Sequence, residues 1–289
     1  MDDCDNVIIQ NCTIHDCSRR AIKFQGDAGI ITNSSILNNS MYNFYSEYAI
    51  QINGIDADHT STGNLVEGNT LYDVSEKGSL LLRYADSNIF RRNTCSGTEE
   101  SNVDIQRSDS NQFYYNLLDH DGSNNNDYQF YIYDGSLNNE IYNNVLVNNG
   151  NDGGVYCSAD STGTKFKNNI YTGSGRAIIV ADGAQVNFES DNNCLYVSGG
   201  NIAGWRGSNY ATLALYQAAS SQDAASIATD PLMVDPSSDD FTLQFGSPCI
   251  NRGAHVGLFL DYRGTGYPVP IGHRPDIGAY EHKNGGRIF

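Results

Sequence analysis

An asparagine recurs along most of this chain in the frame apolar-x-x-Asn-x-apolar, and this repeat constrains the fold more than any other feature. Eight segments share the frame, with Cys or Ser replacing Asn in the first two: 9–14, 31–36, 66–71, 90–95, 113–118, 141–146, 166–171 and a weaker one around Asn193 and Leu195. Successive marker positions lie 22, 35, 24, 23, 28, 25 and 24 residues apart. A period near 24 with short β-type runs is typical of one coil of a parallel β-helix. The sequence therefore predicts an all-β, right-handed parallel β-helix of about eight coils over residues 1–199.

The asparagine itself has a physical role at such a position. A side-chain amide at an inward turn can bond the backbone of its own turn and the next Asn along the stack. Buried polar groups need partners of this kind. We therefore expect Asn93, Asn116, Asn144 and Asn169 to stack inside consecutive coils.

Each coil also carries a second strand, roughly 9 to 16 residues after the marker. Side chains alternate along a strand, so two columns of residues point outward, with neighbours about 4.8 Å apart. The first column is Lys23, Gln51, Leu81, Asp104, Tyr131, Tyr156 and Ile179, and the second is Gln25, Asn53, Arg83, Gln106, Tyr133, Ser158 and Ala181.

Two irregular spacings predict where the solenoid is elaborated. The 35-residue coil has extra residues within 38–46 and 54–63, and the 28-residue coil has extra residues within 120–127. Insertions in solenoids usually collect on the binding face. We interpret 38–46 and 54–63 as walls of a groove over the second strands, the alternative being surface loops without a ligand.

Charge and cysteine content exclude several classes of function. The formal net charge of −17 argues against nucleic acid, because no basic patch is present to neutralise phosphates. It also weighs against a strongly anionic ligand unless a local cation or metal reverses the field. No apolar run approaches the ~18 residues that a membrane helix needs. The seven cysteines include no CxxC pair, and we expect Cys12, Cys95 and Cys157 to point inward as small hydrophobic residues.

After Gly200 the repeat stops. Residues 208–219 predict a short helix, with Leu213, Leu215 and Tyr216 on its apolar side. Asp-Pro-Leu at 230–232, Gly-Ser-Pro at 246–248 and Asp-Ile-Gly-Ala-Tyr-Glu at 276–281 follow. A solenoid must cover the open end of its core, so we expect residues 200–289 to form a capping segment packed on the coils.

This ending, together with the Asn-marked coils, is similar to that of extracellular bacterial β-helix proteins of the polysaccharide-lyase-like superfamily. The resemblance implies a structural role for Asp276 and Glu281 and an extracellular or cell-surface location. No signal peptide is visible, because Met1 is followed at once by acidic residues, and we expect a mature or trimmed chain.

Residues 78–84, Gly-Ser-Leu-Leu-Leu-Arg-Tyr, resemble the arginine-bearing strand of the alginate lyase and chondroitinase B family. By this likeness Arg83 is the catalytic arginine, which holds a uronate carboxylate while a base removes the neighbouring proton. The family pairs this arginine with a lysine on the preceding coil, but residues 53–55 here are Asn-Gly-Ile. Lys77 or His59 would have to substitute, and Asp104 completes the candidate catalytic set. The alternative is an outward arginine that bonds Asp104 or a turn.

Two further patterns suggest ligands. Glu100, Asp127 and Asp152 fall at equivalent positions of consecutive coils, where they would bind calcium, act as a hydrolytic pair or form a solvated turn. Tyr131, Tyr133 and Tyr156 offer flat faces to sugars, although tyrosine also favours strands for its propensity alone. Gln51, Asn53 and Gln106 would supply polar contacts on the floor of the groove.

These observations leave three hypotheses, all with a polysaccharide or oligosaccharide as partner. The leading one is a lyase that cleaves a polysaccharide by β-elimination. The second is a glycoside hydrolase with paired Asp and Glu. The third is a non-catalytic surface or phage-type adhesin.

Overall fold

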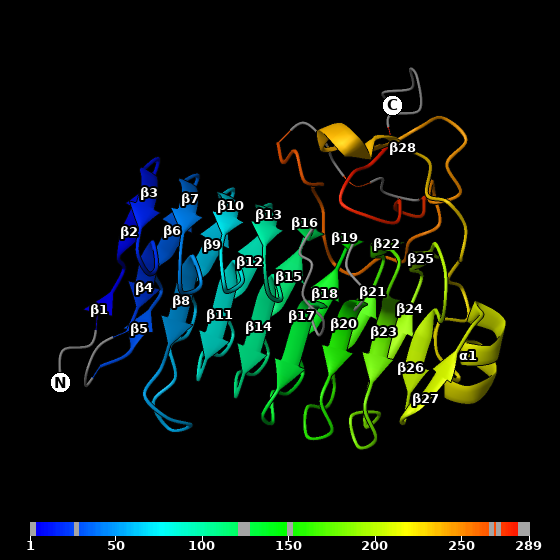
Figure 1. The fold of residues 1–289 in the computed structure, drawn as a ribbon, viewed down its shortest axis with the longest axis horizontal. Helices are drawn as coiled ribbons and strands as arrows, with labels where there is room; N and C mark the ends of the chain where they lie inside the picture. Colours follow the sequence, from blue (N-terminus) through cyan, green and yellow to red (C-terminus); the bar gives the residue numbers. More distant parts are fainter. Residues whose placement is uncertain are drawn as a thin grey trace.

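Three long parallel sheets wrap around one core in the computed structural model, which describes residues 4–25, 29–120, 128–148, 153–265, 269 and 273–282. Each coil gives one strand to each sheet, and the coils follow one another along the long axis (Figure 1). The predicted parallel β-helix of about eight coils is confirmed.

The strands of each sheet are equivalent positions in successive coils. Sheet 1 contains β2 (Ile8–Gln10), β6 (Ser35–Leu37), β9 (Leu65–Glu67), β12 (Ile89–Arg91), β15 (Gln112–Tyr114), β18 (Glu140–Tyr142), β21 (Lys165–Lys167) and β24 (Glu189–Asp191). Sheet 2 contains β3 (Thr13–Cys17), β7 (Ser40–Phe44), β10 (Thr70–Val74), β13 (Thr94–Thr98), β16 (Leu117–His120), β19 (Val145–Asn148), β22 (Ile170–Gly173) and β25 (Cys194–Val197).

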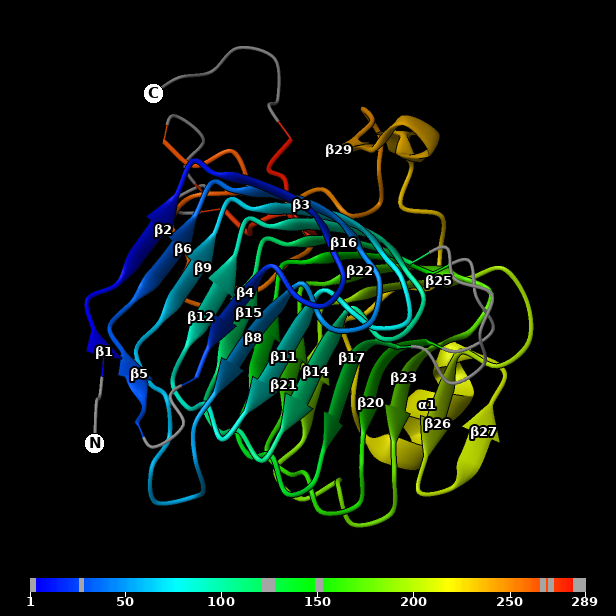
Figure 2. The same ribbon diagram turned by 60° about the vertical axis from the view of Figure 1, so that its left-hand side comes forward.

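Sheet 3 holds the second strands predicted from the sequence. It contains β4 (Ile22–Phe24), β8 (Ile50–Asn53), β11 (Leu80–Arg83), β14 (Val103–Gln106), β17 (Tyr128–Tyr133), β20 (Gly153–Cys157), β23 (Arg176–Val180), β26 (Ala203–Trp205) and the antiparallel β27 (Ser208–Tyr210). β1 (Cys4–Asp5) and β5 (Ile31–Thr32) form a short separate pair. Figure 2 shows the strands of sheet 3 side by side along the solenoid.

The core is filled by inward residues that stack from coil to coil. In sheet 3, Ile50, Leu80, Val103, Phe130 and Val155 align in register and are fully buried. Phe130 also packs against Phe113 of sheet 1 in an edge-to-face contact, with the ring centroids 5.3 Å apart. The in-out alternation expected from the sequence is therefore the observed one.

A ladder of asparagine side chains runs through the turn between sheets 1 and 2. Asn144 shows the pattern: its amide nitrogen Nδ2 donates to Asn169 Oδ1 at 3.0 Å, while its Oδ1 accepts from the backbone and side chain of Asn116. Its members, buried throughout, are Asn39, Asn69, Asn93, Asn116, Asn144, Asn169 and Asn193. The predicted stacking of Asn93, Asn116, Asn144 and Asn169 is confirmed.

In each Asn-Asn pair at this turn, the first asparagine reverses the backbone and the second joins the ladder. Asn38, Asn143 and Asn192 have φ values of 54°, 53° and 57°, a left-handed conformation that asparagine tolerates. The residue after each one joins the ladder. The backbone reversal and the stacking amide are thus neighbouring positions of one motif.

The sequence assignment of the second coil was wrong by five residues. The strand register pairs Asn39, not Ser34, with the ladder residue Asn69. Ser34 begins a second ladder before sheet 1, which continues through Asn64, Asn88, Asn111 and Asn139. Both ladders place a small polar residue two positions before an inward apolar one, so the frame matched either.

This shift of register corrects two further predictions. Residues 40–44 are strand β7, with Met41 and Phe44 fully buried, so the segment 38–46 is no loop and no groove wall. Cys12 is exposed, because it lies in the first described coil, whereas Cys95 and Cys157 are buried as expected. The extra residues within 54–63 do form a loop between β8 and β9.

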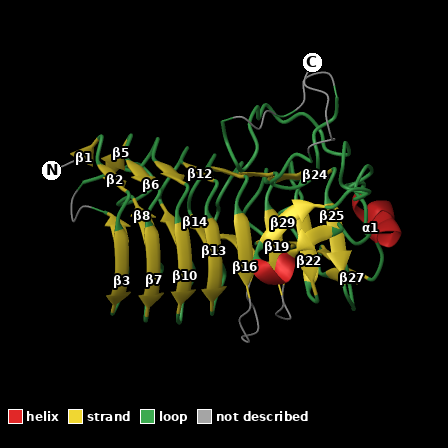
Figure 3. Ribbon diagram, turned by 90° about the horizontal axis from the view of Figure 1, so that it is seen from above, coloured by secondary structure: helices red, strands yellow, loops and turns green. Residues whose placement is uncertain are grey.

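Beyond the last coil the chain folds back over the solenoid. Helix α1 (Leu213–Ser220) packs on β26 and buries Tyr216 beside Trp205 (Figure 1). The chain then forms β28 (Met233–Asp235), a 3-10 helix (Pro236–Ser238) and β29 (Asp240–Leu243). The later part lies over the corner between sheets 1 and 2, where Asn168 bonds Ala254 and Arg92 bonds Asp261 (Figure 3).

This returning segment has an apolar contact surface of its own. Met233, Phe241 and Ile277 pack with Tyr142 and Ile170 of the coils in a second core, outside the solenoid interior. The division into residues 1–199 and 200–289 as separate units stays a prediction. In the described part of the chain, α1 and any other helix fall short of the length and apolarity needed to cross a membrane.

Candidate functional site

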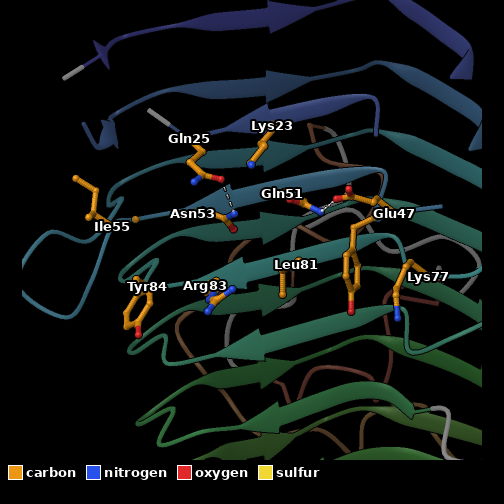
Figure 4. A pocket seen from close by; sticks show the side chains of 12 residues that line it. Lys23, Gln25, Glu47, Gln51, Asn53, Ile55, Lys77, Leu81, Arg83 and Tyr84 are labelled. Atoms are coloured by element: carbon orange, nitrogen blue, oxygen red, sulfur yellow. Dashed lines mark hydrogen bonds between the residues drawn. The ribbon is translucent and has the colours of Figure 1, made fainter. Parts of the chain in front are cut away.

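The outer face of sheet 3 carries a groove over its first coils, with a volume of about 480 Å³. Its lining consists of Lys23, Gln25, Glu47, Tyr48, Gln51, Asn53, Gly54, Ile55, Lys77, Leu81, Arg83 and Tyr84. Figure 4 shows Arg83 and Leu81 on one strand. Lys23 and Gln25 lie two strands away, beyond the strand that carries Gln51 and Asn53. The lining therefore draws on both predicted outward columns.

Arg83 lies at the centre of the second column. The register places it between Asn53 of β8 and Gln106 of β14. Its guanidinium is exposed and forms no ion pair within the described residues. The guanidinium carbon lies 5.9 Å from the ring centroid of Tyr84. Neighbouring amides carry no negative charge, so the guanidinium of Arg83 stays available to an anionic ligand in the groove.

Tyr84 lies directly beyond β11 in a left-handed turn, with a φ of 51°. Its hydroxyl accepts a hydrogen bond of 2.8 Å from Nη1 of Arg107, whose guanidinium carbon is 5.6 Å from the ring centroid. The phenol thus lines the groove with one arginine on each side.

Lys77 lies in the turn before β11 and lines the groove near its other edge. Its Nζ is 2.6 and 2.7 Å from the two carboxylate oxygens of Glu100. The predicted catalytic lysine and the predicted calcium ligand therefore form a half-exposed ion pair with each other. Asp127 and Asp152, the other two predicted calcium ligands, lie outside the described residues. Within the described ranges no three His, Cys, Asp or Glu side chains gather as a metal site would require.

Glu47 and Tyr48 build the wall at the start of β8. Glu47 accepts hydrogen bonds from Arg20 and from Gln51, and the bond from Arg20 holds the pKa of this carboxyl below its usual value. Tyr48 is buried and donates its hydroxyl to the carboxylate of Asp104. Burial, followed by the charge of Asp104, raises the pKa of Tyr48 far above its ordinary value, so the phenol stays protonated as a donor.

The predicted residues thus fall into three environments. Gln51, Asn53, Lys77 and Arg83 line the groove, Asp104 lies behind its wall, and Gln106 is beside Arg83 with its amide on Asp134. His59 lies on the 54–63 loop with its ring 2.8 Å from Asp56, and it does not line the groove. The residue of this loop that lines the groove is Ile55, together with Gly54 directly after β8.

Asn53 has a buried acceptor at the floor of the groove. Its Nδ2 donates to Gln25 at 3.0 Å, while its Oδ1 has no hydrogen-bond partner among the described residues. The residue is 8% exposed. An unsatisfied buried acceptor costs about 1–3 kcal/mol, which a donating ligand would recover after a small rotation of the amide.

The predicted tyrosines form a cluster further along sheet 3. Tyr131 stacks on Tyr133 with centroids 4.4 Å apart, and Tyr128 stacks on Tyr156 at 5.0 Å. Burial raises the pKa of both Tyr131 and Tyr133, so these phenols stay neutral. The register joins the cluster to the groove, since Tyr133 is beside Gln106 and Gln106 is beside Arg83.

Several lining residues had been missed from the sequence. Lys23 stands beside Gln51 in the first outward column, where the sequence placed it, but it was not named among the predicted site residues. Glu47 and Tyr48 were missed because they belong to a turn. The alternation of side chains along a strand does not predict where the side chains of a turn point.

The comparisons with known proteins bear on the repeat. The family model described as right-handed β-helix region matches residues 1–170. The chain belongs to this family. The right-handed all-β solenoid is therefore established, whereas membership of the lyase-like group is not.

Among solved structures, the chain resembles the A-module of the mannuronan C-5 epimerase of Azotobacter vinelandii. The two are 16% identical, with a TM-score of 0.33 over 69% of this chain and 58% of the module. The chain thus spans less than two thirds of that module's length. No curated protein shows significant sequence similarity to the chain.

Proposed function

We propose that the groove of sheet 3 binds an acidic polysaccharide and that the protein cleaves it by β-elimination. The observation that carries this proposal is Arg83, an exposed guanidinium without an ion pair within the described residues, held between two amides at the centre of the groove. Lys23 and Lys77 add two further cations to the same lining.

These cations matter because the chain as a whole is strongly acidic, with a formal net charge of −17. Arg83, which forms no ion pair in the described part of the chain, makes the centre of the groove locally cationic and favours a ligand with carboxylates. Within the lining the carboxylate is that of Glu47, which Arg20 and Gln51 already engage. The groove therefore selects for an anionic sugar rather than a neutral one.

In the proposed reaction Arg83 pairs with the carboxylate of a uronic acid residue. This contact stabilises the charge that develops on the carboxylate when the proton on the adjacent carbon leaves. The electrons of that C–H bond form the double bond of the product, and the glycosidic C–O bond breaks with its electron pair on the leaving oxygen. The leaving oxygen then takes up a proton.

Tyr84 is the proposed proton acceptor. It adjoins Arg83 and lines the groove, and Arg107 already donates to its oxygen. In this step the phenolate form of Tyr84, its negative charge stabilised by the guanidinium groups of Arg83 and Arg107, takes the proton and becomes a neutral phenol. The phenol then passes this proton to the leaving oxygen. Lys77 is less suited to this role because its Nζ already bonds both carboxylate oxygens of Glu100.

A glycoside hydrolase remains the second candidate and a glycan-binding adhesin the third. A hydrolase needs two carboxylates across the scissile bond, one of them protonated. Glu47 is the carboxylate of the groove lining, and the hydrogen bond from Arg20 lowers its pKa, which opposes an acid role. This observation favours elimination over hydrolysis.

A screen of acidic and neutral polysaccharides tests the proposal. Elimination gives a product that absorbs in the ultraviolet, whereas hydrolysis gives new reducing ends without that absorbance. We expect absorbance with a uronate-containing polymer, its loss in Arg83→Ala, and a reduction of about 100-fold or more in Tyr84→Phe. Arg206→Ala, which removes an exposed arginine paired with Asp182 away from the groove, is the control and should keep full activity.

Three results would contradict the proposal in different ways. New reducing ends without absorbance would assign the protein to the hydrolases. Saturable binding without any product would assign it to the adhesins. An active enzyme that keeps most of its rate in Arg83→Ala would remove the role given to this arginine.

A further inference from the structure

Two cysteines that are 55 residues apart in the chain meet outside the solenoid interior. Cys194 begins β25 of the last coil, and Cys249 belongs to the segment that folds back after β29. Both side chains are fully buried in the second core, and the two thiols are neighbours there.

The contact follows from how the returning chain is fastened to the coil. Ile227 pairs in parallel with Cys194, whose thiol donates to the carbonyl of Thr229 at 3.2 Å. Ser247 then ties the next segment to this one, because its hydroxyl donates to the carbonyl of Pro231 and accepts from the backbone N–H of Cys249. The backbone thus sets both cysteines in place independently of their own contact.

We propose that Cys194 and Cys249 form a disulfide bond when the protein folds under oxidising conditions. The bond would fix the returning segment covalently to the last coil and close a loop across residues 194–249. Such a bond stabilises chiefly by restricting the unfolded chain, and the effect grows with loop length.

The chemistry is thiol–disulfide exchange with a small-molecule or protein disulfide as the oxidant. The thiolate of one cysteine attacks a sulfur of the oxidant and displaces one thiolate from it. The second cysteine, as thiolate, attacks the mixed disulfide and displaces the other half. The protein loses two protons and two electrons, and the oxidant is reduced to two thiols.

The bond should form during folding rather than afterwards. The neighbouring thiol of Cys249 and burial raise the pKa of the Cys194 thiol well above its ordinary value, and a protonated thiol is a poor nucleophile. In the folded, reduced protein the pair should therefore react slowly with added oxidant.

The other cysteines have different surroundings. Cys95 and Cys157 are buried in the solenoid core, where their thiols contact Ser79 and Thr164. Cys4, Cys12 and Cys17 lie toward the start of the chain and are exposed or half-buried. Of the seven thiols in the sequence, we therefore expect two to be consumed and five to remain.

The experiment compares full-length protein made in a reducing cytosol with protein exported to an oxidising periplasm. Both are alkylated under denaturing conditions, digested without reduction and analysed by mass spectrometry. The periplasmic protein should yield a cross-linked peptide containing Cys194 and Cys249, and its Tm should exceed that of the cytosolic protein by on the order of 5 °C.

Matched variants separate the bond from general effects of cysteine replacement. Cys194→Ser and Cys249→Ser should each abolish the cross-linked peptide and make the two preparations equal in Tm. Cys17→Ser should keep both the peptide and the difference in Tm. Recovery of Cys194 and Cys249 as alkylated thiols from the folded periplasmic protein, or their bonding to other cysteines, would overturn the proposal.

Discussion

Tyr48 donates a hydrogen bond to the carboxylate of Asp104 across the whole width of strand β11. Tyr48 precedes β8 and Asp104 belongs to β14, so this contact joins the two strands that flank β11. Both side chains are buried, at 8% and 6% exposure. The contact holds Tyr48 in the wall of the groove.

Removal of the Tyr48 hydroxyl should therefore destabilise the protein. Tyr48→Phe leaves the ring in place but takes a donor from the buried Asp104 carboxylate, at a cost of about 1–3 kcal/mol. Chemical denaturation measures the loss. Tyr45→Phe is the control, because Tyr45 is 55% exposed and should tolerate the change. Equal stability of Tyr48→Phe and the unmodified protein would show that this contact contributes nothing.

The asparagine ladder gives a second prediction about stability. Asn144→Ala would leave the backbone and side-chain N–H groups of Asn116 without their shared acceptor, and it would remove the donor that Asn144 supplies to the carbonyls of Phe113 and Tyr142. We expect a loss of about 1–3 kcal/mol in the free energy of unfolding. Asn209→Ala, at an exposed position, should change stability little. A similar small effect at Asn144 would mean that the stack is not a source of stability.

The coil structure could be predicted because stacked asparagines need the same residue type once per coil. The same regularity caused the error at Ser34, where two ladders run five residues apart and the serine of one fitted the frame of the other. The outward columns could also be predicted, since alternation along β11 fixes where Leu81 and Arg83 point.

The walls of the groove could not be predicted in the same way. The Glu47–Arg20 contact and the Tyr48–Asp104 contact join residues 27 and 56 positions apart, through turns whose path depends on packing. The pairing of Lys77 with Glu100 was equally hidden. It depends on long side chains that lean from one coil to the next, which strand periodicity does not describe.

The distance between Arg83 and the tyrosine cluster predicts how long a saccharide must be to contact both. Tyr133 lies two strands beyond Arg83, about 10 Å along the axis at the usual strand spacing. Tyr133→Ala should raise KM by about 3- to 10-fold with little change in kcat, because it removes a stacking surface away from the reacting bond. Short fragments that cannot reach the cluster should be insensitive to the change. Tyr196→Ala on sheet 2 is the control, and a fall in kcat alone would contradict this role for Tyr133.

The last prediction concerns the dependence of stability on pH, through Glu281 in the returning segment. This carboxyl is 8% exposed, and burial together with the nearby Asp276 and Asp261 raises its pKa to about 8. Its oxygens accept from the backbone N–H of Asp276 at 3.2 and 3.3 Å. In the unfolded chain the same group titrates near its ordinary value of 4.5.

Between these two values the folded state binds a proton that the unfolded state has released. The contribution of Glu281 is therefore fully present below about pH 4.5 and is lost as the pH rises through 8, with a slope of at most about 1.4 kcal/mol per pH unit. Asp276, whose pKa burial also raises, acts in the same direction.

Glu281→Gln isolates this effect, because glutamine keeps the acceptor but does not titrate. The difference in unfolding free energy between the unmodified protein and Glu281→Gln should shift steadily in favour of the variant from pH 5 to pH 8. Titrating groups remote from Glu281 are common to both proteins and cancel, whereas Asp276 and Asp261, which interact with it, contribute to the measured difference. Glu189→Gln provides the opposite control, since the hydrogen bond from Lys167 lowers the pKa of Glu189 and its contribution should be lost only toward acid pH. A difference for Glu281→Gln that stays constant over this range would show that the carboxyl is already ionised in the folded protein.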